Sequence, residues 1–505
     1  MYGAVEGSLA KNKLLINQKA GKLTKQNNIL REFEPVFFPK SLAVVGATSD
    51  KVFKINIGNR FIEVLLEFGF TGKLFAVGMS EGEVSGLKIY QNVKDIPSDL
   101  DYVIAVIPNR HIPQLVEDCG QKGVKVVHLF VSGFGEIEDN MGAELQEEIL
   151  RIAKNYGIRL IGPNCMGTYC PSSRLTFAVG FSAVAGHVGY LSQSGGQSIL
   201  GIKEANRRNI FFSKVVSYGN AVDINECDLI EYFTNDPETD IITAYIEGTN
   251  HGPRLFELLK EATKRKPVVL FKCAATEGGS QAAISHTSAI AGSDLTWEAL
   301  LQQTGAIRVY NIKEMFDVVS VLQHCPEIKG LNTLLVGHGG GSCVQASDDC
   351  YRVGLNMPIL PDELRQALMQ VYKTDAGNIF KNPLDINPYW GMDKAREAFS
   401  AVAGWDGADV IMLLSTPEQT PFIPRDFEYK VTTKALIEWA KLSPKLVVLA
   451  MNVNTVPGDD GMPEKSFIKL QEAGFAVFPS AERAATAVAR VYRYYQWRQK
   501  RTSKF

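Results

Sequence analysis

The feature that most constrains the fold is a regular alternation of short apolar runs with longer, helix-like stretches. Five apolar runs precede residue 165, at 42–47, 74–78, 102–108, 124–133 and 158–164. Each has the length of a strand, is continuously apolar, and is bounded by residues typical of turns. Strands buried on both faces belong to parallel sheets that helices cover on either side. This part of the chain therefore predicts an α/β domain.

The same pattern restarts twice further along the chain. The second set of apolar runs lies at 187–196, 213–220, 241–248 and 267–273, and the third at 331–341, 408–415, 445–452 and 475–480. A chain of 505 residues is too long for a single core. We therefore expect three α/β domains, at 36–175, 176–327 and 328–490, with a lysine-rich, possibly flexible leader at 1–35 and a basic tail at 491–505.

Each set contains a strand that runs directly into a glycine turn. The turns are VVGATSDK, LSQSGGQS and LVGHGGGS, and each could bind phosphate where a helix begins. The first departs from the dinucleotide pattern G-x-G-x-x-G, since it has only Gly46 and then Gly58, and the next strand ends without an acidic residue. Both departures argue against NAD. Thr48, Ser49 and Lys51 still suit a diphosphate, and a purely structural turn stays the alternative.

Composition excludes several classes of protein. The net charge of −2 gives no general attraction for nucleic acid or an anionic membrane. The 8 cysteines form no C-x-x-C pair and no cluster with zinc spacing, so we expect reduced thiols, no metal site and a cytoplasmic protein. No signal peptide and no apolar run of membrane-spanning length is evident.

The stretch AAISHTSAIAGSD (282–294) carries one of only 7 histidines, His286, among small side chains. In one interpretation, Ser194, Asp223 and His286 follow the chain order of an α/β-hydrolase triad, although the serine turn lacks the first glycine of G-x-S-x-G. In the other, His286 accepts a phosphoryl group, with backbone donors at Gly195 and Gly196 and a carboxylate from Glu247. A solvated loop histidine and a surface glutamate remain alternatives to both.

Nine stretches in a fixed order carry a family resemblance. They are FFPKSLAVVGATSD, VSGLKIYQNVKDIP, SGFGE, RLIGPNCMG, LSQSGG, FSKVVSYGNAVDINECDLIEYFTNDPET, YIEG, SHTSAIAGSD and NPLDI. Over residues 36–490 the chain resembles the nucleoside-diphosphate-forming acyl-CoA synthetases, kin of the α-subunit of succinyl-CoA synthetase. The resemblance implies a Rossmann-like CoA-binding domain followed by two flavodoxin-like domains, and a ligase that works through acyl phosphate and phosphohistidine.

The resemblance also assigns roles to individual residues. The phosphorylated histidine falls on His286 and its supporting glutamate on Glu247. Phosphate binding is implied for Asn164, Gln193, Ser194, Gly195 and Gly196; CoA binding for Gly46, Ala47, Thr48, Ser49, Lys51, Pro108, Ser132, Gly133 and Phe134; and a phosphate loop on the nucleotide side for Gly339, Gly340 and Gly341. We expect the acid to be bound by the stretch CPSSRLTFAVGF (170–181).

The chain departs from the family at Ala275 and Gln281, where basic residues are usual, and at Ser288, where glycine is usual. These departures leave a non-catalytic CoA or acyl-CoA sensor as an alternative function. The part after residue 490 has no room for an ATP-grasp domain. The resemblance therefore implies a separate ATP-grasp β-subunit that carries ATP or ADP and Mg²⁺, and a hetero-oligomer.

Overall fold

The computed structural model describes most of the chain. The described residues are 28–50, 55–136, 140–279, 281, 292–324, 327–373, 377–386, 392–415, 430, 433–438, 441, 443, 445–451 and 462–502. They fall into two compact units: unit 1 is Met1–Lys203 with Phe211–Arg308, and unit 2 is Glu204–Ile210 with Val309–Phe505. No helix of the described part is long and apolar enough to cross a membrane.

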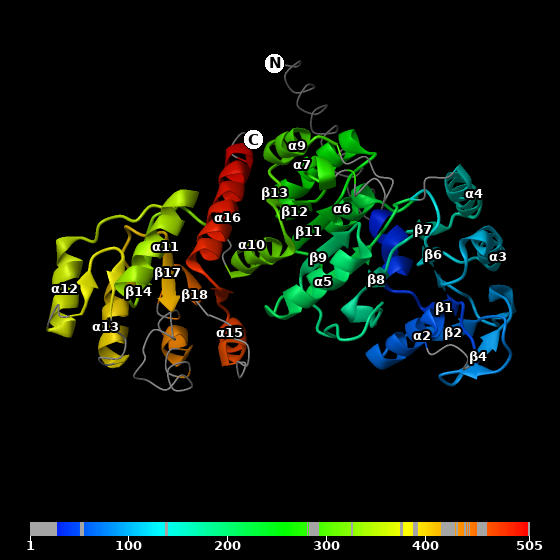
Figure 1. Ribbon diagram of the computed structural model, residues 1–505, viewed down its shortest axis with the longest axis horizontal. Helices are drawn as coiled ribbons and strands as arrows, with labels where there is room; N and C mark the ends of the chain where they lie inside the picture. The colour runs from blue at the N-terminus through cyan, green and yellow to red at the C-terminus, as the bar shows by residue number, and fades with distance from the viewer. Residues whose placement is uncertain are drawn as a thin grey trace, which may run out of the picture. The chain divides into compact units, whose positions relative to one another are not determined.

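Unit 1 begins with a seven-stranded sheet of order β3-β4-β2-β1-β5-β6-β7 (Figure 1). Its strands are β1 (Ser41–Val45), β2 (Lys73–Val77), β3 (Glu83–Val84), β4 (Leu87–Tyr90), β5 (Tyr102–Ala105), β6 (Val126–Leu129) and β7 (Arg159–Ile161). All pair in parallel except β3 with β4. From β1 the chain moves toward one edge of the sheet, to β2, and from β5 it moves toward the opposite edge, to β6. Right-handed crossovers therefore place α2 (Ile57–Phe68) on one face and α3 (Ile112–Lys122) with α4 (Asn140–Tyr156) on the other.

The second sheet of unit 1 has the order β13-β12-β11-β9-β10-β8. Its strands are β8 (Gly167–Tyr169), β9 (Val188–Ser192), β10 (Phe212–Ser217), β11 (Ile241–Ile246), β12 (Val268–Lys272) and β13 (Ile307–Val309). The helices of this region are α5 (Gly195–Asn206), α6 (Glu226–Asn235), α7 (Gly252–Arg265) and α9 (Asp294–Thr304). Because β8 pairs with β10, this sheet starts before the predicted boundary at residue 176.

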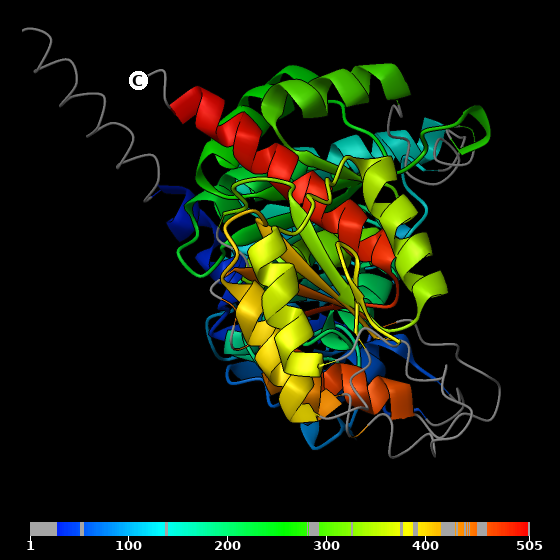
Figure 2. The same cartoon turned by 90° about the vertical axis from the view of Figure 1, so that its left-hand side faces the viewer.

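Unit 2 holds the third sheet, of order β15-β16-β14-β17-β18-β19. Its strands are β14 (Thr333–Gly337), β15 (Ile379–Phe380), β16 (Leu384–Asp385), β17 (Val410–Ser415), β18 (Leu446–Met451) and β19 (Ala476–Phe478). Its helices are α10 (Ile312–His324), α11 (Gly340–Val353), α12 (Asp362–Tyr372), α13 (Met392–Ala403), α15 (Met462–Glu472) and α16 (Ala481–Thr502). In Figure 2, α12 lies beside α13 and α16 lies beside α11. The three sheets confirm the predicted α/β fold.

Both ends of the packed chain extend beyond the predicted domain limits. A helix at 28–37 precedes the boundary at residue 36, and its Phe33 and Phe37 are fully buried. Their rings stack on Tyr232 of α6 at centroid distances of 5.1 and 4.7 Å. At the other end α16 continues to Thr502, and Val491 and Tyr494 are buried on it. The end of the expected leader and most of the expected tail are therefore helical, and each helix is packed onto the protein by buried apolar side chains.

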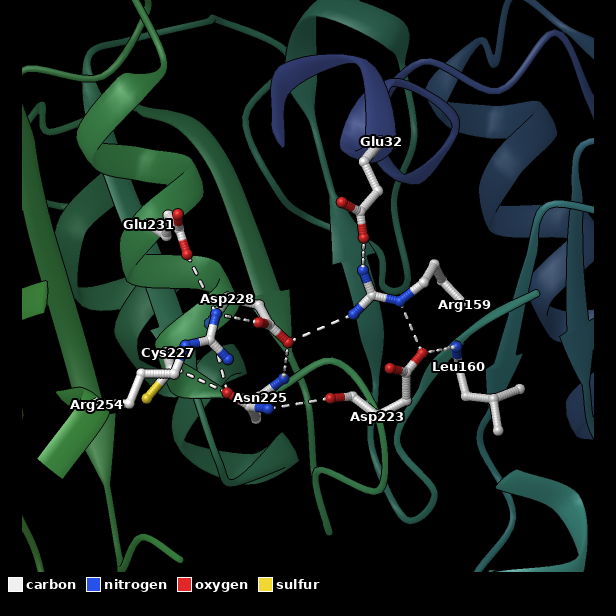
Figure 3. A network of polar contacts seen from close by, with 9 residues as sticks. All are labelled: Glu32, Arg159, Leu160, Asp223, Asn225, Cys227, Asp228, Glu231 and Arg254. Atoms are coloured by element: carbon white, nitrogen blue, oxygen red, sulfur yellow. Dashed lines mark hydrogen bonds and ion pairs between the residues drawn. The ribbon is translucent and has the colours of Figure 1, made fainter. Parts of the chain in front are cut away.

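An ion-pair network joins the two sheets of unit 1 (Figure 3). Arg159, the first residue of β7, donates from Nε to Asp223 Oδ2 at 2.8 Å, and its guanidinium also pairs with Asp228 of α6 and Glu32 of the first helix. Asp223 Oδ2 also accepts the backbone N–H of Leu160 at 2.8 Å. This network ties the amino-terminal edge of the first sheet to the start of α6.

Candidate functional site

A cavity of about 570 Å³ opens in unit 1 where strands of both sheets end. Its lining residues follow β6, β7, β9 and β11: Phe130, Ser132, Asn164, Cys165, Met166, Gln193, Ser194, Gly195, Gly196, Ile199 and Glu247. Ligands of open α/β sheets bind at this kind of edge. The structure therefore brings together the five predicted phosphate-binding residues, the predicted catalytic glutamate and Ser132.

The amino end of α5 forms one wall of this cavity. Gly195 and Gly196 are the first residues of the helix, so their N–H groups have no partner within it and can bind an anion. A Cβ on Gly195 would lie 2.9 Å from Met166 Cγ, which explains why glycine stands there. Ser194 precedes the helix, and its Oγ accepts the N–H of Gln197 at 3.4 Å. Ser194 thus caps the helix.

Gln193 positions the backbone that carries Glu247. Its Oε1 accepts the N–H of Glu247 at 2.7 Å and of Gly248 at 3.1 Å. Since both bonds use the amide oxygen, the amide NH₂ is the part of Gln193 that remains to donate to a ligand. The side chain is 3% exposed, so packing restrains this orientation.

The two carboxylate oxygens of Glu247 differ in their hydrogen bonding. Its Oε1 accepts the hydroxyl of Tyr245 at 3.1 Å. Its Oε2 is buried and has no hydrogen-bond partner among the described residues. A buried carboxylate oxygen without a donor is costly, so this atom is suited to accept an N–H or O–H from a residue or ligand that enters the cavity.

The loop 162–166, which carries Asn164, is held from several sides. Asn164 adopts a left-handed conformation with φ 59° and donates its N–H to the carbonyl of Val131 at 2.9 Å. The carbonyl of Cys165 lies 3.2 Å from Nε2 of His128, a fully enclosed residue of β6. His128 was not predicted, because a histidine inside an apolar strand carries no local signal of its partner.

His128 predicts a specific pH dependence of stability. Burial lowers its pKa to about 4, below the ordinary value of 6.5. As the pH falls below 6.5, the unfolded chain takes up a proton that the folded chain refuses until about pH 4. The free energy of unfolding should therefore drop by about 3 kcal/mol between pH 7 and pH 4 through this residue. Urea unfolding of His128→Gln, compared with the wild type at both pH values, should show a correspondingly smaller drop; equal drops would contradict the assignment.

The predicted CoA turn lies at the end of β1, and most of its groups have partners within the protein. A Cβ on Gly58 would lie 2.4 Å from the carbonyl oxygen of Gly46, so Gly58 allows α2 to approach the turn closely. The N–H of Ala47 donates to Val77, that of Thr48 to Asn59 Oδ1, and that of Ser49 to Ser80 Oγ. Asn59 and Ser80 were not predicted, since their roles depend on the approach of α2 and β2.

The remaining predicted CoA residues differ in their exposure. Pro108 is exposed at the end of β5, and Gly133 has φ 94° after β6. Phe134 is fully buried in the core of the first sheet, so its side chain does not line an open path. Lys51 lies outside the described residues.

The third glycine turn lies in unit 2, where α11 begins. Gly339 precedes the helix with φ 96°, and its N–H donates to Asp385 Oδ1 at 2.9 Å. Gly340 and Gly341 open the helix, and a Cβ on Gly341 would meet nothing within 4 Å. The aspartate of the NPLDI stretch therefore shapes this turn.

The stretch around His286 is described only at its ends, and His286 and Ser288 lie outside the described residues. Ala275 is exposed just after β12. Lys272, the last residue of β12, is buried and donates to the carbonyls of Cys273 and Ala274. Burial lowers the pKa of Lys272 to about 8. This cation at the base of the stretch was not predicted.

The hydrolase interpretation is not supported by the geometry. Asp223 Oδ2 accepts hydrogen bonds from Arg159 Nε and from the backbone N–H of Leu160, so Asp223 belongs to the ion-pair network of Figure 3. Ser194 caps α5. The acid of a triad must orient the histidine, whereas Asp223 Oδ2 is engaged by Arg159 and Leu160.

The expected acid-binding stretch 170–181 does not line the cavity. Leu175, Phe177 and Phe181 are buried, and the rings of Phe177 and Phe181 pack edge-on at 5.3 Å. These apolar side chains serve the packing of unit 1.

Comparisons with known proteins show to which family the chain is related. Residues 40–171 match the CoA binding domain family and residues 185–322 the succinyl-CoA ligase like flavodoxin domain. The chain is 32% identical to the α-subunit of an ADP-forming acetate–CoA ligase I of Pyrococcus furiosus, over 93% of this chain and 99% of that one. It is 30% identical, with a TM-score of 0.79, to a solved acetyl-coenzyme A synthetase 1 of Ca. Korarchaeum cryptofilum in complex with phosphate and ADP, covering 94% of this chain and 99% of that one.

Other relatives are longer. An ADP-forming acetate–CoA ligase of Methanocaldococcus jannaschii is 36% identical over 70% of this chain, and the match spans 49% of that protein. About half of that relative therefore has no counterpart in the matched region.

Proposed function

We propose that this chain, which belongs to the family of ADP-forming acyl-CoA synthetases, is an acid–thiol ligase subunit that interconverts acyl-CoA, ADP and phosphate with a carboxylic acid, CoA and ATP. One observation carries the proposal. The start of α5, Asn164, Gln193 and Glu247 line the same cavity, and Oε2 of Glu247 has no hydrogen-bond partner in the described part of the chain. Anion donors beside a carboxylate acceptor suit a phosphoryl group next to an imidazole.

The proposed reaction has two chemical steps on this chain. An oxygen of phosphate attacks the thioester carbonyl, the C–S bond breaks, and CoA leaves as the thiol after taking a proton, which yields acyl phosphate. A nitrogen of His286 then attacks phosphorus, and the bond between phosphorus and the acyl oxygen breaks, which releases the carboxylate. Glu247 Oε2 accepts the other N–H of the imidazole and stabilises its positive charge, while α5 holds the phosphoryl oxygens.

The phosphoryl group then passes to ADP on a partner. We place ADP, ATP and Mg²⁺ on an ATP-grasp β-subunit and assign Gly339, Gly340 and Gly341 to the nucleotide side of the transfer. The length of the Methanocaldococcus jannaschii relative supports a partner, because half of that ligase lies outside the match with this chain. The turn at Gly46, Ala47, Thr48, Ser49 and Lys51, with Pro108, Ser132 and Gly133, is our proposed CoA site.

Labelling tests the proposal. The full-length chain, incubated with acetyl-CoA and ³²P-phosphate, should acquire acid-labile label and release CoA. His286→Ala should abolish the label, whereas His187→Ala, at a histidine whose side chain is 71% exposed, should retain it. Label that persists in His286→Ala would refute the assignment. Binding of the thioester without label, even with the β-subunit present, would favour the sensor.

Gln193→Ala should slow this labelling by about 100-fold. The substitution removes the NH₂ donor and frees the N–H groups of Glu247 and Gly248, so both the phosphate site and the glutamate lose their support. Quenched-flow measurement of label gives the rate, and Gln302→Ala on the surface of α9 is the matched control. A loss of thermal stability with an unchanged labelling rate would make Gln193 merely structural.

A further inference from the structure

Lys272 is a buried cation that the proposed reaction does not use. It is the last residue of β12 and is 2% exposed, and the chain leaves the sheet directly after it for the stretch 274–292, which carries His286. Burying an ammonium group is unfavourable unless nearby groups bind it, so its place at this point of the chain needs an explanation. The groups that contact it belong to the two ends of the stretch.

At the first end, Lys272 binds the backbone that leaves β12. Its Nζ donates to the carbonyl of Cys273 and, at 3.5 Å, to that of Ala274. Ala274 has φ 55°, a left-handed conformation that a residue with a Cβ keeps only where its surroundings hold it. The two carbonyls lie on either side of the Cα of Ala274. The ammonium therefore fixes the direction in which the chain leaves the sheet.

At the second end, Lys272 contacts the helix into which the stretch leads. Its Nζ lies 5.4 Å from the ring centroid of Trp297 on α9, and Trp297 is buried. A cation at this distance from an aromatic ring is attracted to it, most strongly where water is excluded. A Cβ built on Gly292 would lie 3.3 Å from Nε1 of Trp297, so the same ring borders the last residue of the stretch. One side chain thus links both ends.

Charged groups from three neighbouring elements act on Lys272. Burial lowers its pKa to about 8. Four other groups act on this pKa: Cys273, Asp294 of α9 and Glu247 after β11 raise it, and Arg308 of β13 lowers it. Arg308 also forms an ion pair with Asp294, which ties α9 to the edge strand. Lys272 is therefore largely protonated at pH 7 and loses its proton as the pH rises through about 8.

The stretch begins beside the proposed catalytic glutamate. Strands β11 and β12 pair in parallel with Lys272 opposite Ile246, and Cys273 donates its N–H to the carbonyl of Ile246 at 2.9 Å. Glu247 follows Ile246 in the chain. The stretch that carries His286 therefore leaves the sheet next to Glu247. The rate at which a nucleophile reacts depends strongly on such placement.

We infer that Lys272 is a positioning residue: its ammonium fixes both ends of the stretch 274–292, so that the rate of phosphoryl transfer to His286 depends on this charge. The inference rests on the proposed function, which gives His286 its role. Lys272 does not contact phosphate or thioester in this assignment. The protonated form is required, because the ring face of Trp297 attracts a cation and not a neutral amine.

Lys272→Met removes the donor and the charge but keeps the apolar part of the side chain. In the full-length chain with acetyl-CoA and ³²P-phosphate at pH 7, labelling should be at least about tenfold slower than in the wild type. Lys266→Met is the matched control. Lys266 precedes the other end of β12, donates to the carbonyls of Phe233 and Asp236 at 2.7 and 2.5 Å, and burial lowers its pKa to about 8 as well. Equal labelling rates in the two variants would overturn the inference.

The pH profile separates the charge of Lys272 from its packing. At pH 9 roughly one tenth of a group with a pKa of about 8 keeps its proton. Lys272→Arg stays charged, so between pH 7 and pH 9 the wild-type rate should fall about tenfold relative to that of Lys272→Arg. Lys266→Met should follow the wild type. Identical profiles of Lys272→Arg and the wild type would contradict the role of the charge, and this comparison decides if Lys272→Met fails to fold by circular dichroism.

Amide hydrogen exchange distinguishes this inference from the proposed function. If the wild type acquires no label, the proposed function fails, but the full-length chain still tests the contacts of Lys272. Lys272→Met should lower the protection factors within 273–279 and 292–304 by at least about tenfold, and Lys266→Met should leave them unchanged. The wild type should lose the same protection between pH 7 and pH 9, a comparison that needs no variant. Unchanged protection would refute the inference.

Discussion

Glu247→Gln is expected to reduce the rate of phosphoenzyme formation by about 1,000-fold. The carboxylate offers Oε2, a buried acceptor without a partner among the described residues, to the imidazole of His286. Glutamine has the same size, but it removes the negative charge that stabilises the imidazolium and can present an NH₂ group where an acceptor is needed. Electrostatic contributions of this kind are worth about 4 kcal/mol in an enclosed site. Labelling with acetyl-CoA and ³²P-phosphate, followed by rapid quenching, measures the effect.

The isosteric change separates chemistry from folding. Oε2 makes no hydrogen bond to the described part of the protein, so Glu247→Gln should leave the thermal unfolding midpoint almost unchanged. Glu257→Gln is the control, because the side chain of Glu257 on α7 is 67% exposed. A Glu247→Gln protein that labels at the rate of the wild type would remove Glu247 from the mechanism.

Lys214→Met should lower the free energy of unfolding of unit 1 by about 3–5 kcal/mol. The ammonium of Lys214 on β10 is 1% exposed and pairs with Asp236 at 2.9 Å and with Glu238 at 2.5 Å. It also lies 5.5–5.9 Å from the ring centroids of Phe37, Phe38 and Tyr232. Methionine fills much of the same volume but leaves the buried carboxylate of Asp236 without its cation, and uncompensated buried charges are costly.

Urea unfolding followed by tryptophan fluorescence and circular dichroism measures this loss. Lys260→Met is the control: Lys260 forms an exposed pair with Glu257 at 3.6 Å on α7, so its removal should cost less than about 0.5 kcal/mol. A Lys214→Met protein as stable as the control would show that the aromatic residues and Asp236 tolerate the missing charge.

The two predictions concern different parts of one unit. Lys214 and the helix at 28–37 hold the second sheet together on the side where Phe37 meets Tyr232. Glu247 and α5 lie at the carboxyl edge of that sheet, where a cavity remains. Stability and chemistry are therefore separable by mutation, which makes the labelling results interpretable.

The sequence predicted a large share of the fold because its signals are local. A run such as 42–47 is apolar at every position, so its burial on both faces is encoded in the run itself. The glycine turns also follow directly from the sequence, because each is a short motif of neighbouring residues that follows an apolar run. The family resemblance then connected Glu247, Gln193 and Asn164 before any geometry was known, and the structure places these three residues around one cavity.

The limits of the packed chain were harder to predict from the sequence. The helix at 28–37 belongs to a lysine-rich stretch, and only the contact of Phe33 and Phe37 with Tyr232, some 200 residues later, buries it. Likewise α16 has a basic surface but buries Val491 and Tyr494 on its other face. In such helices the many basic residues of the exposed face dominate the composition, so the few buried apolar residues are hard to recognise from the sequence.

By itself, then, the sequence determined three α/β sheets, their glycine turns and the family's catalytic pattern, since periodicity and short motifs are properties of neighbouring residues. Only the tertiary structure decided that Asp223 pairs with Arg159, that His128 supports Cys165, and that Phe130, Met166 and Ile199 line one cavity. These relations depend on which strands pair and on the side to which each crossover turns, so residues 33 to 69 positions apart meet through topology that no local pattern encodes.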